Sequence, residues 1–126
     1  MAEALVDAFL GGALDAGAFR HAHHVEVAFG LLGRGDFLHA ATNLSAGLKA
    51  ITARAGHPGA YHETITLAFL ALVAERRGAG DGGEFECFAE LNPDLFDKGV
   101  LGRWYAPDRL GSDLARHTFL LPGPAR

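Results

Sequence analysis

Residues 61–77 read YHETITLAFLALVAERR and decide the fold, because nearly every side of this segment is apolar. On a helical wheel that advances about 100° per residue, His62 lies on the same side as Phe69. Leu67 and Leu70 make the opposite side apolar as well, and this pattern is typical of a helix that protein covers on most sides. We therefore expect residues 61–77 to form a helix at the centre of the molecule.

Glycine and proline divide the rest of the chain into further short helical segments. Upstream we expect helices at residues 3–10, 19–32 and about 37–55, each followed by glycine. Asp15 is expected to cap the second of these helices, and Asp36 the third, because a carboxylate at this position accepts from a free backbone N–H.

The segments downstream of the central helix are shorter and less regular. The glycine-rich residues 78–83 are expected to form a mobile loop. A short helix is expected at residues 84–91, and one more helical turn at Ser112–Arg116, with Ser112 as its cap. The apolar residues 119–122 are expected to pack on the helices as an extended tail.

Composition and pattern together predict one all-α domain. The chain has 126 residues, of which 49% are hydrophobic and 21% charged, as in ordinary globular proteins. No apolar and polar alternation is long enough to predict a strand. We therefore expect residues 1–126 to form a single domain, a small bundle of three long helices whose ends shorter helices cover.

Charge and cysteine content narrow the classes of partner and location. The net charge of −4 and the pI near 5.9 give no basic surface for the phosphates of a nucleic acid. Apolar runs are far shorter than the roughly 20 residues that span a bilayer, so we expect no membrane segment. The N-terminus lacks the positive flank of a secretory signal and Cys87 has no partner in the chain, so we expect a cytoplasmic protein. Between acidic neighbours, Cys87 is expected to pack in the core rather than act as a thiolate.

The histidines separate into inward and outward groups. His21 and His24 are one helical turn apart and lie within the apolar stripe of residues 19–32, whereas His23 points away from it. His62 also points inward from the central helix. His39 lies opposite the apolar face of its helix and is expected to be exposed.

Three inward imidazoles on two helices suggest a metal site. His21, His24 and His62 could supply three nitrogens to one ion and leave room for water or substrate. Zinc, iron, copper or nickel would suit such ligands. The alternative is that each ring is an ordinary core histidine bonded to a carbonyl or a carboxylate.

Other polar residues near these histidines are candidates for chemistry. Glu63 is expected to face protein and to act as an acid or base or to accept from a ligand imidazole. Tyr61 is the second catalytic candidate, and it lines the predicted cavity together with Thr66, a ligand-binding candidate. Arg116 could return over the helices and pair with Glu63 or with an anionic ligand. The segment Arg103–Tyr105, with the aromatic residues Trp104 and Tyr105, would form either a lid or part of the core.

The same positions carry a resemblance to a group of small uncharacterised bacterial proteins. The matching segments are Phe19–His24 (F-x-H-x-x-H), Tyr61–Thr66 (Y-H-E-T-x-T) and Ala115–Pro122 (A-R-x-x-F-x-L-P). The resemblance implies that the positions of interest are His21, His24, His62, Glu63 and Arg116, and that His23 and His39 are incidental. It implies no reaction.

The leading hypothesis is a metal-dependent enzyme or a metal-centred binding protein that acts on a small molecule. A second hypothesis is a metal-free binding module, in which the imidazoles and Arg116 hold an anionic or aromatic ligand in an apolar cavity. A third is a structural bundle that forms a homodimer.

Overall fold

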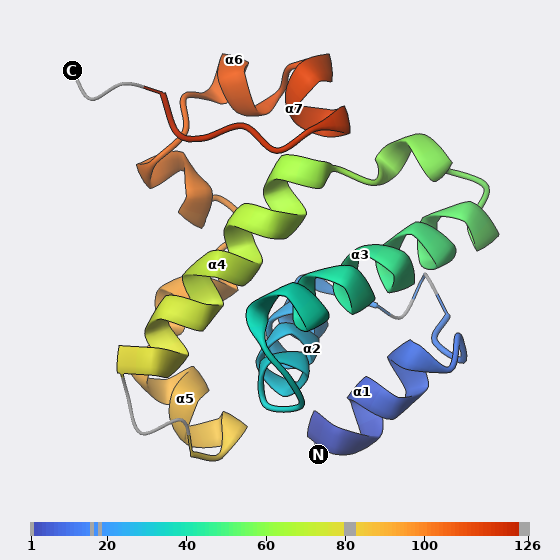
Figure 1. Cartoon of the computed structure of the whole chain (residues 1–126), viewed down its shortest axis with the longest axis vertical. Coiled ribbons are helices and arrows are strands. Elements are labelled where there is room, and N and C mark those ends of the chain that lie inside the picture. The colour runs from blue at the N-terminus through green and yellow to red at the C-terminus, as the bar shows by residue number, and fades with distance from the viewer. Residues whose placement is uncertain (1, 16, 18, 80–82, 124–126) are drawn as a thin grey trace.

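The computed structural model of the chain describes residues 2–15, 17, 19–79 and 83–123 (Figure 1). Every regular element in these residues is a helix, which confirms the all-α class. The α-helices are α1 (Ala2–Leu10), α2 (His21–Leu32), α3 (Phe37–Arg54), α4 (Glu63–Ala79), α5 (Phe85–Leu91), α6 (Pro107–Leu110) and α7 (Asp113–His117). The 3-10 helices are η2 (Pro58–Ala60), η3 (Pro93–Phe96) and η4 (Val100–Arg103).

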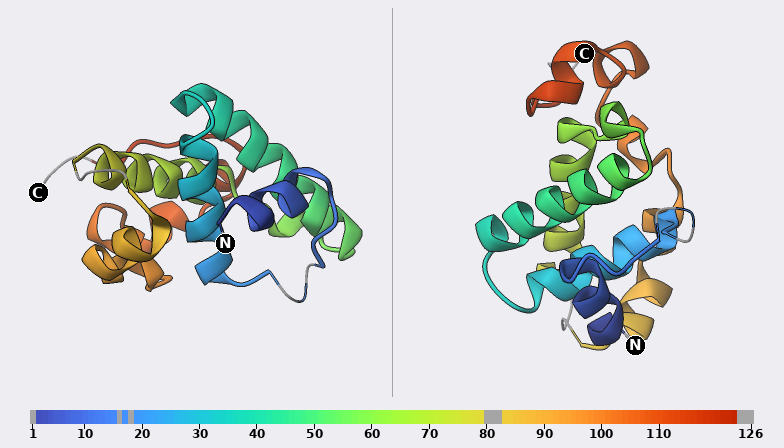
Figure 2. Two further views of the ribbon diagram at one scale, coloured as in Figure 1. Left: turned by 90° about the horizontal axis from the view of Figure 1, so that it is seen from below. Right: turned by 90° about the vertical axis from the view of Figure 1, so that its right-hand side faces the viewer.

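Helix α4 runs through the middle of the molecule. It packs against α2 and α3, and against α7 and η4 of the C-terminal part. Figures 1 and 2 show α6 and α7 at one end of the molecule, and α1 and α5 at the other. Helices α2, α3 and α4 cross one another rather than run along a common axis, so the expected geometry of a three-helix bundle is not confirmed.

The core lies where these helices cross. Among its fully buried side chains are Val25 and Leu31 of α2, Leu70 and Val73 of α4, and Leu95 of η3. Complete burial of each such side chain stabilises the fold by about 1.5–3 kcal/mol. The apolar pattern of the 61–77 segment thus places α4 under cover from several elements.

Capping explains where several helices begin. The Asp36 carboxylate accepts from the His39 N–H at 2.8 Å, and the Ser112 hydroxyl accepts from the Ala115 N–H at 3.1 Å, so both predicted caps are confirmed. The expectation for Asp15 is wrong, because α2 begins after Arg20. There the Arg20 N–H donates to Nδ1 of His23 at 3.0 Å. His23 is the histidine that the sequence predicts to point outward.

Other expectations from the sequence have mixed outcomes. Cys87 is exposed, so the expectation that it packs in the core is wrong. His39 is exposed as expected. Part of the expected mobile loop, residues 80–82, lies outside the described residues. Among the helices that the structure describes, none is long and apolar enough to cross a membrane.

The C-terminal segment is fastened to the amino end of α4. The buried Thr64 hydroxyl donates to the Thr118 carbonyl at 2.7 Å and accepts from the Leu120 N–H at 3.0 Å. The Tyr105 hydroxyl donates to the Leu120 carbonyl at 2.8 Å. These bonds support the expectation that the tail packs on the helices, although the side chains of Phe119 and Leu121 stay exposed.

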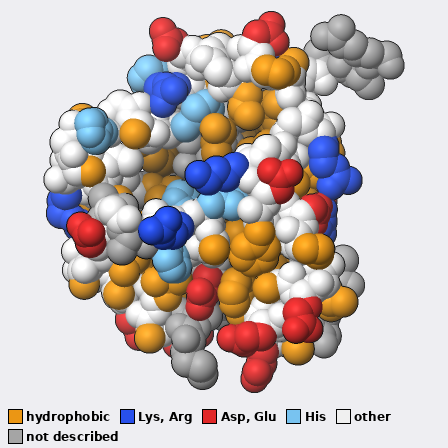
Figure 3. All heavy atoms as spheres, turned by 180° about the vertical axis from the view of Figure 1, so that it is seen from behind, with side chains coloured by type: hydrophobic (Ala, Val, Ile, Leu, Met, Phe, Trp, Pro, Cys, Tyr) orange, Lys and Arg blue, Asp and Glu red, His pale blue; other side chains and the backbone are white. Residues whose placement is uncertain are grey.

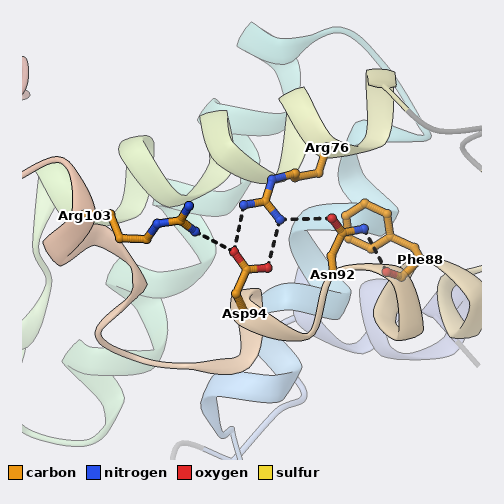
Figure 4. A network of polar contacts seen from close by, with 5 residues as sticks. All are labelled: Arg76, Phe88, Asn92, Asp94 and Arg103. Atoms are coloured by element: carbon orange, nitrogen blue, oxygen red, sulfur yellow. Dashed lines mark hydrogen bonds and ion pairs between the residues drawn. The ribbon is translucent and has the colours of Figure 1, made fainter.

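A second polar connection holds η3 against the other half of α4 (Figure 4). The Arg76 guanidinium donates to both carboxylate oxygens of Asp94, at 2.9 and 2.8 Å, and to Asn92 Oδ1 at 3.0 Å. Arg103 adds a third bond to Asp94 at 2.9 Å. Because Asp94 directly precedes the buried Leu95, this network fixes the position of the Leu95 backbone.

The Asp94 network predicts an acid-sensitive contribution to stability. The hydrogen bonds from Arg76 lower the pKa of Asp94 from 3.8 to about 2. Its ion pairs therefore stabilise the fold fully above pH 5, and this stabilisation is lost as the pH falls from about 4 through 2. Because the side chain is 36% exposed, we expect only about 1 kcal/mol.

Urea unfolding of the Asp94→Asn variant between pH 7 and pH 2 measures this contribution. The variant should be less stable than the wild type at pH 7 and should lose less stability on acidification. The exposed Asp108→Asn variant is the matched control and should follow the wild type. Parallel pH profiles for wild type and Asp94→Asn would contradict the assignment.

Candidate functional site

A cavity of about 320 Å³ lies between α2, α3 and α4, and we call it the α2–α4 cavity. All three inward-predicted histidines lie on its wall, together with Tyr61 and Thr66. The other described residues that line it are Leu44, Leu48, Thr52, Ala60, Ile65, Phe69, Lys98, Val100 and Leu101. Most of this surface is apolar, and none of the described lining residues is acidic.

His21 is oriented by the backbone of η3. Its Nε2 lies 2.9 Å from the Leu95 carbonyl, so Nε2 carries the proton and donates it there. The ring packs against Phe69 with the centroids 5.2 Å apart. This bond leaves Nδ1 of His21 as the ring atom that can accept from a ligand.

His62 is fully engaged with the backbone. It directly precedes α4, and its Nδ1 accepts from the Ile65 N–H at 3.1 Å, as a helix cap does. Its Nε2 donates to the Leu110 carbonyl at 2.7 Å. With one nitrogen accepting and the other donating, this ring connects α4 to α6 and has no free lone pair.

Of the three histidines on the cavity wall, His24 is the one whose ring has no hydrogen bond to a backbone group of the described residues. Its ring lies 4.6 Å from that of Phe19 and 6.1 Å from that of His21, measured between centroids. The His24 ring nitrogens form no hydrogen bond with any other residue in the described part of the chain. Its ring nitrogens are therefore the ones available to a molecule in the cavity.

The surroundings of His24 keep its ring uncharged. Burial, together with smaller electrostatic contributions from His21, His23 and Lys98 in that order, lowers the pKa of His24 from 6.5 to about 4. At neutral pH the ring therefore offers one N–H donor and one acceptor.

Lys98 is a residue of the site that the sequence analysis missed. It lies in the turn between η3 and η4, where no helical periodicity could assign it to a face. Its side chain lines the α2–α4 cavity, and it forms no ion pair with any residue that the structure describes. Figure 3 shows histidine and Lys or Arg side chains close together on one face of the molecule, beside exposed apolar surface.

The predicted metal ligands do not assemble as a metal centre in this arrangement. No group of three or more His, Cys, Asp or Glu side chains within the described residues is placed to hold an ion. His62 would have to give up its bond with Ile65 or with Leu110 before it could coordinate. The metal site stays a prediction from the sequence, and the present geometry does not fit it.

Glu63 and Tyr61 form a pair beside the cavity. The Tyr61 hydroxyl donates to Glu63 Oε1 at 2.6 Å, and it lies 2.8 Å from the Ser45 hydroxyl. Burial raises the pKa of Tyr61, and the hydrogen bond to the Glu63 carboxylate raises it further. Tyr61 lines the cavity, whereas Glu63 is not among the residues on its wall. The contact that the structure shows for Glu63 is thus the hydrogen bond from Tyr61, and its catalytic role stays a prediction.

Arg116 and the segment Arg103–Tyr105 do not line the α2–α4 cavity. Arg116 donates from Nη1 to the Gly59 carbonyl at 2.8 Å and lines a different pocket. It therefore does not join the histidines, and no ion pair with Glu63 forms. Trp104 and Tyr105 line another hollow, beside α4 and the tail, and are no lid over the histidines.

Comparison of the chain with protein-family models, with curated proteins and with solved structures finds no match.

The lowered pKa of His24 predicts a second pH effect on stability, separate from that of Asp94. The unfolded chain binds a proton at this ring near pH 6.5 and the folded chain only near pH 4, so stability falls as the pH drops through that interval. A shift of this size corresponds to roughly 3 kcal/mol.

Histidine titration by NMR and urea unfolding between pH 7 and pH 4 test this prediction. His24→Phe, which keeps a ring against Phe19, should lose this part of the pH dependence. The exposed His57→Gln variant should keep it. A His24 ring that titrates near 6.5 in the folded protein would refute the prediction.

Proposed function

We propose that the α2–α4 cavity binds a small organic anion with an apolar body, and that the protein is a metal-free binding module. The observation that carries the proposal is the polar end of the cavity. There, Lys98 and the unbonded ring of His24 are the available cation and hydrogen-bond donor, and no carboxylate lines the same wall within the described residues.

The chemistry of the lining favours a carboxylate. The Lys98 ammonium supplies a positive charge, and the neutral His24 ring supplies an N–H, so the two oxygens of a carboxylate can each find a donor. Because the side chains around His24 are largely apolar, its bond forms with reduced competition from water, whereas the exposed Lys98 contributes mainly its charge.

The volume of the α2–α4 cavity and its apolar side chains limit the size and polarity of the rest of the ligand. A cavity of about 320 Å³ is at the lower end of the range for small-molecule sites, roughly 300–1,000 Å³. Leu44, Leu48 and Phe69 on one side and Val100 and Leu101 on another offer apolar surface. A medium-chain aliphatic acid or a single-ring aromatic acid fits this description.

A purely structural role accounts less well for these residues. A core made only for packing gains nothing from a desolvated His24 ring beside a lysine, because an apolar side chain of similar volume would fill the position without a desolvation cost. The metal-dependent hypothesis differs in its ligands, since it needs His62 to exchange a backbone bond for a metal bond.

Binding of matched acids and neutral analogues tests the proposal. Octanoate and benzoate, but not octanamide or benzamide, should raise the melting temperature and give saturable heats in calorimetry, because a ligand of the folded state stabilises it. Lys98→Gln and His24→Phe should each lower the affinity for the acids by about tenfold or more, since a hydrogen bond to a charged group contributes roughly 1.5–3 kcal/mol.

Matched controls separate this effect from a general loss of charge or of histidine. Lys49→Gln removes a lysine outside the cavity, and His57→Gln removes an exposed histidine, so both should bind the acids as the wild type does. Zn²⁺ and Ni²⁺ are titrated in parallel. A stoichiometric metal that His62→Ala abolishes would favour the metal-dependent hypothesis, and no response to acids or metals would favour the structural one.

A further inference from the structure

A second pocket lies where α3, η2 and α7 meet. It has a volume of about 380 Å³, and its wall includes Lys49, Thr52, Gly59, Tyr61, Arg116 and His117. It shares Tyr61 and Thr52 with the α2–α4 cavity but none of that cavity's charged residues. No Asp or Glu is among the described residues that line it.

Arg116 is held in place in this pocket without a carboxylate partner. The side chain is half-buried, and its Nη1 donates to the Gly59 carbonyl at 2.8 Å. Among the described residues nothing bonds to its Nε or Nη2. A planar guanidinium fixed at one corner presents its remaining N–H groups as a fork that suits an oxyanion.

Lys49 supplies the second positive charge. Its Nζ lies 5.1 Å from the centroid of the Tyr61 ring, which holds the ammonium beside the pocket by a cation–π interaction. Lys49 also has no carboxylate partner in the described part of the chain. The nearby Glu63 carboxylate accepts from the Tyr61 hydroxyl and does not line the pocket.

We propose that this pocket binds the phosphate group of a small phosphate monoester. Two lasting positive charges match the two negative charges of a phosphate monoester, whose second pKa is about 6. The Arg116 fork bonds two of the phosphate oxygens, and Lys49 acts as a point charge on the third. The pocket is independent of the acid-binding function proposed above, because the two spaces have different cations.

Titration of the ¹⁵N-labelled protein with inorganic phosphate and with glycerol 3-phosphate at low ionic strength tests the proposal. Both should give saturable shifts centred on the Gly59 amide and the Arg116 Nε–H signal. Lys49→Gln and Arg116→Gln should weaken binding by about tenfold each, the loss expected for one charged hydrogen bond. Chloride at equal ionic strength should give no saturable shift.

Two further variants, Arg116→Lys and Lys98→Gln, make the result decisive. Arg116→Lys keeps the charge and loses the fork, so its affinity should lie between those of wild type and Arg116→Gln. Lys98→Gln should bind phosphate as the wild type does, which distinguishes failure here from failure of the acid-binding proposal. Lys49 is exposed, so Lys49→Gln remains informative if Arg116→Gln does not fold. Shifts that do not saturate, or that all variants share, would overturn the proposal.

Discussion

The amino end of α4 is enclosed by protein, so its backbone groups need partners that water supplies elsewhere. His62 meets this requirement from within the segment itself, whereas the Thr64 side chain bonds backbone groups of the C-terminal segment. Nδ1 of His62 accepts from the Ile65 N–H, while the same ring donates to the Leu110 carbonyl. Thr64 bonds the backbone at Thr118 and Leu120. The cover of α4 by the C-terminal segment follows from these few bonds.

Hydrogen bonds to the backbone also distinguish the three histidines that the sequence predicts to have the same role. Both ring nitrogens of His62 form hydrogen bonds, which connect α4 to α6. The His21 ring is oriented by its bond to the Leu95 carbonyl. Of these three histidines, only His24 has both ring nitrogens available to a ligand, and its lowered pKa keeps the ring neutral at pH 7. The Arg76–Asp94 network contributes indirectly, because it fixes η3 and thereby the carbonyl that orients His21.

Local rules account for what the sequence could predict. Helical periodicity assigned inward directions to His21, His24 and His62, and capping preferences gave the starts of α3 and α7 at Asp36 and Ser112. A hydrogen bond from a side chain to a distant backbone carbonyl cannot be predicted from the pattern of side chains, because every residue has such a carbonyl. The bonds from His21 to Leu95 and from Arg116 to Gly59 are of this kind, with 74 and 57 positions between the partners. Lys98 was missed for a related reason, because a residue in a turn has no periodicity to reveal its direction.

The long sequence separation of the bonds at Thr64 and His62 has a consequence for biosynthesis. Their partners lie 48 to 56 positions downstream, so they emerge from the ribosome well after α4 itself. During that interval water, instead of the C-terminal segment, must bond the Thr64 hydroxyl and the Nε2–H of His62, and the amino end of α4 stays uncovered.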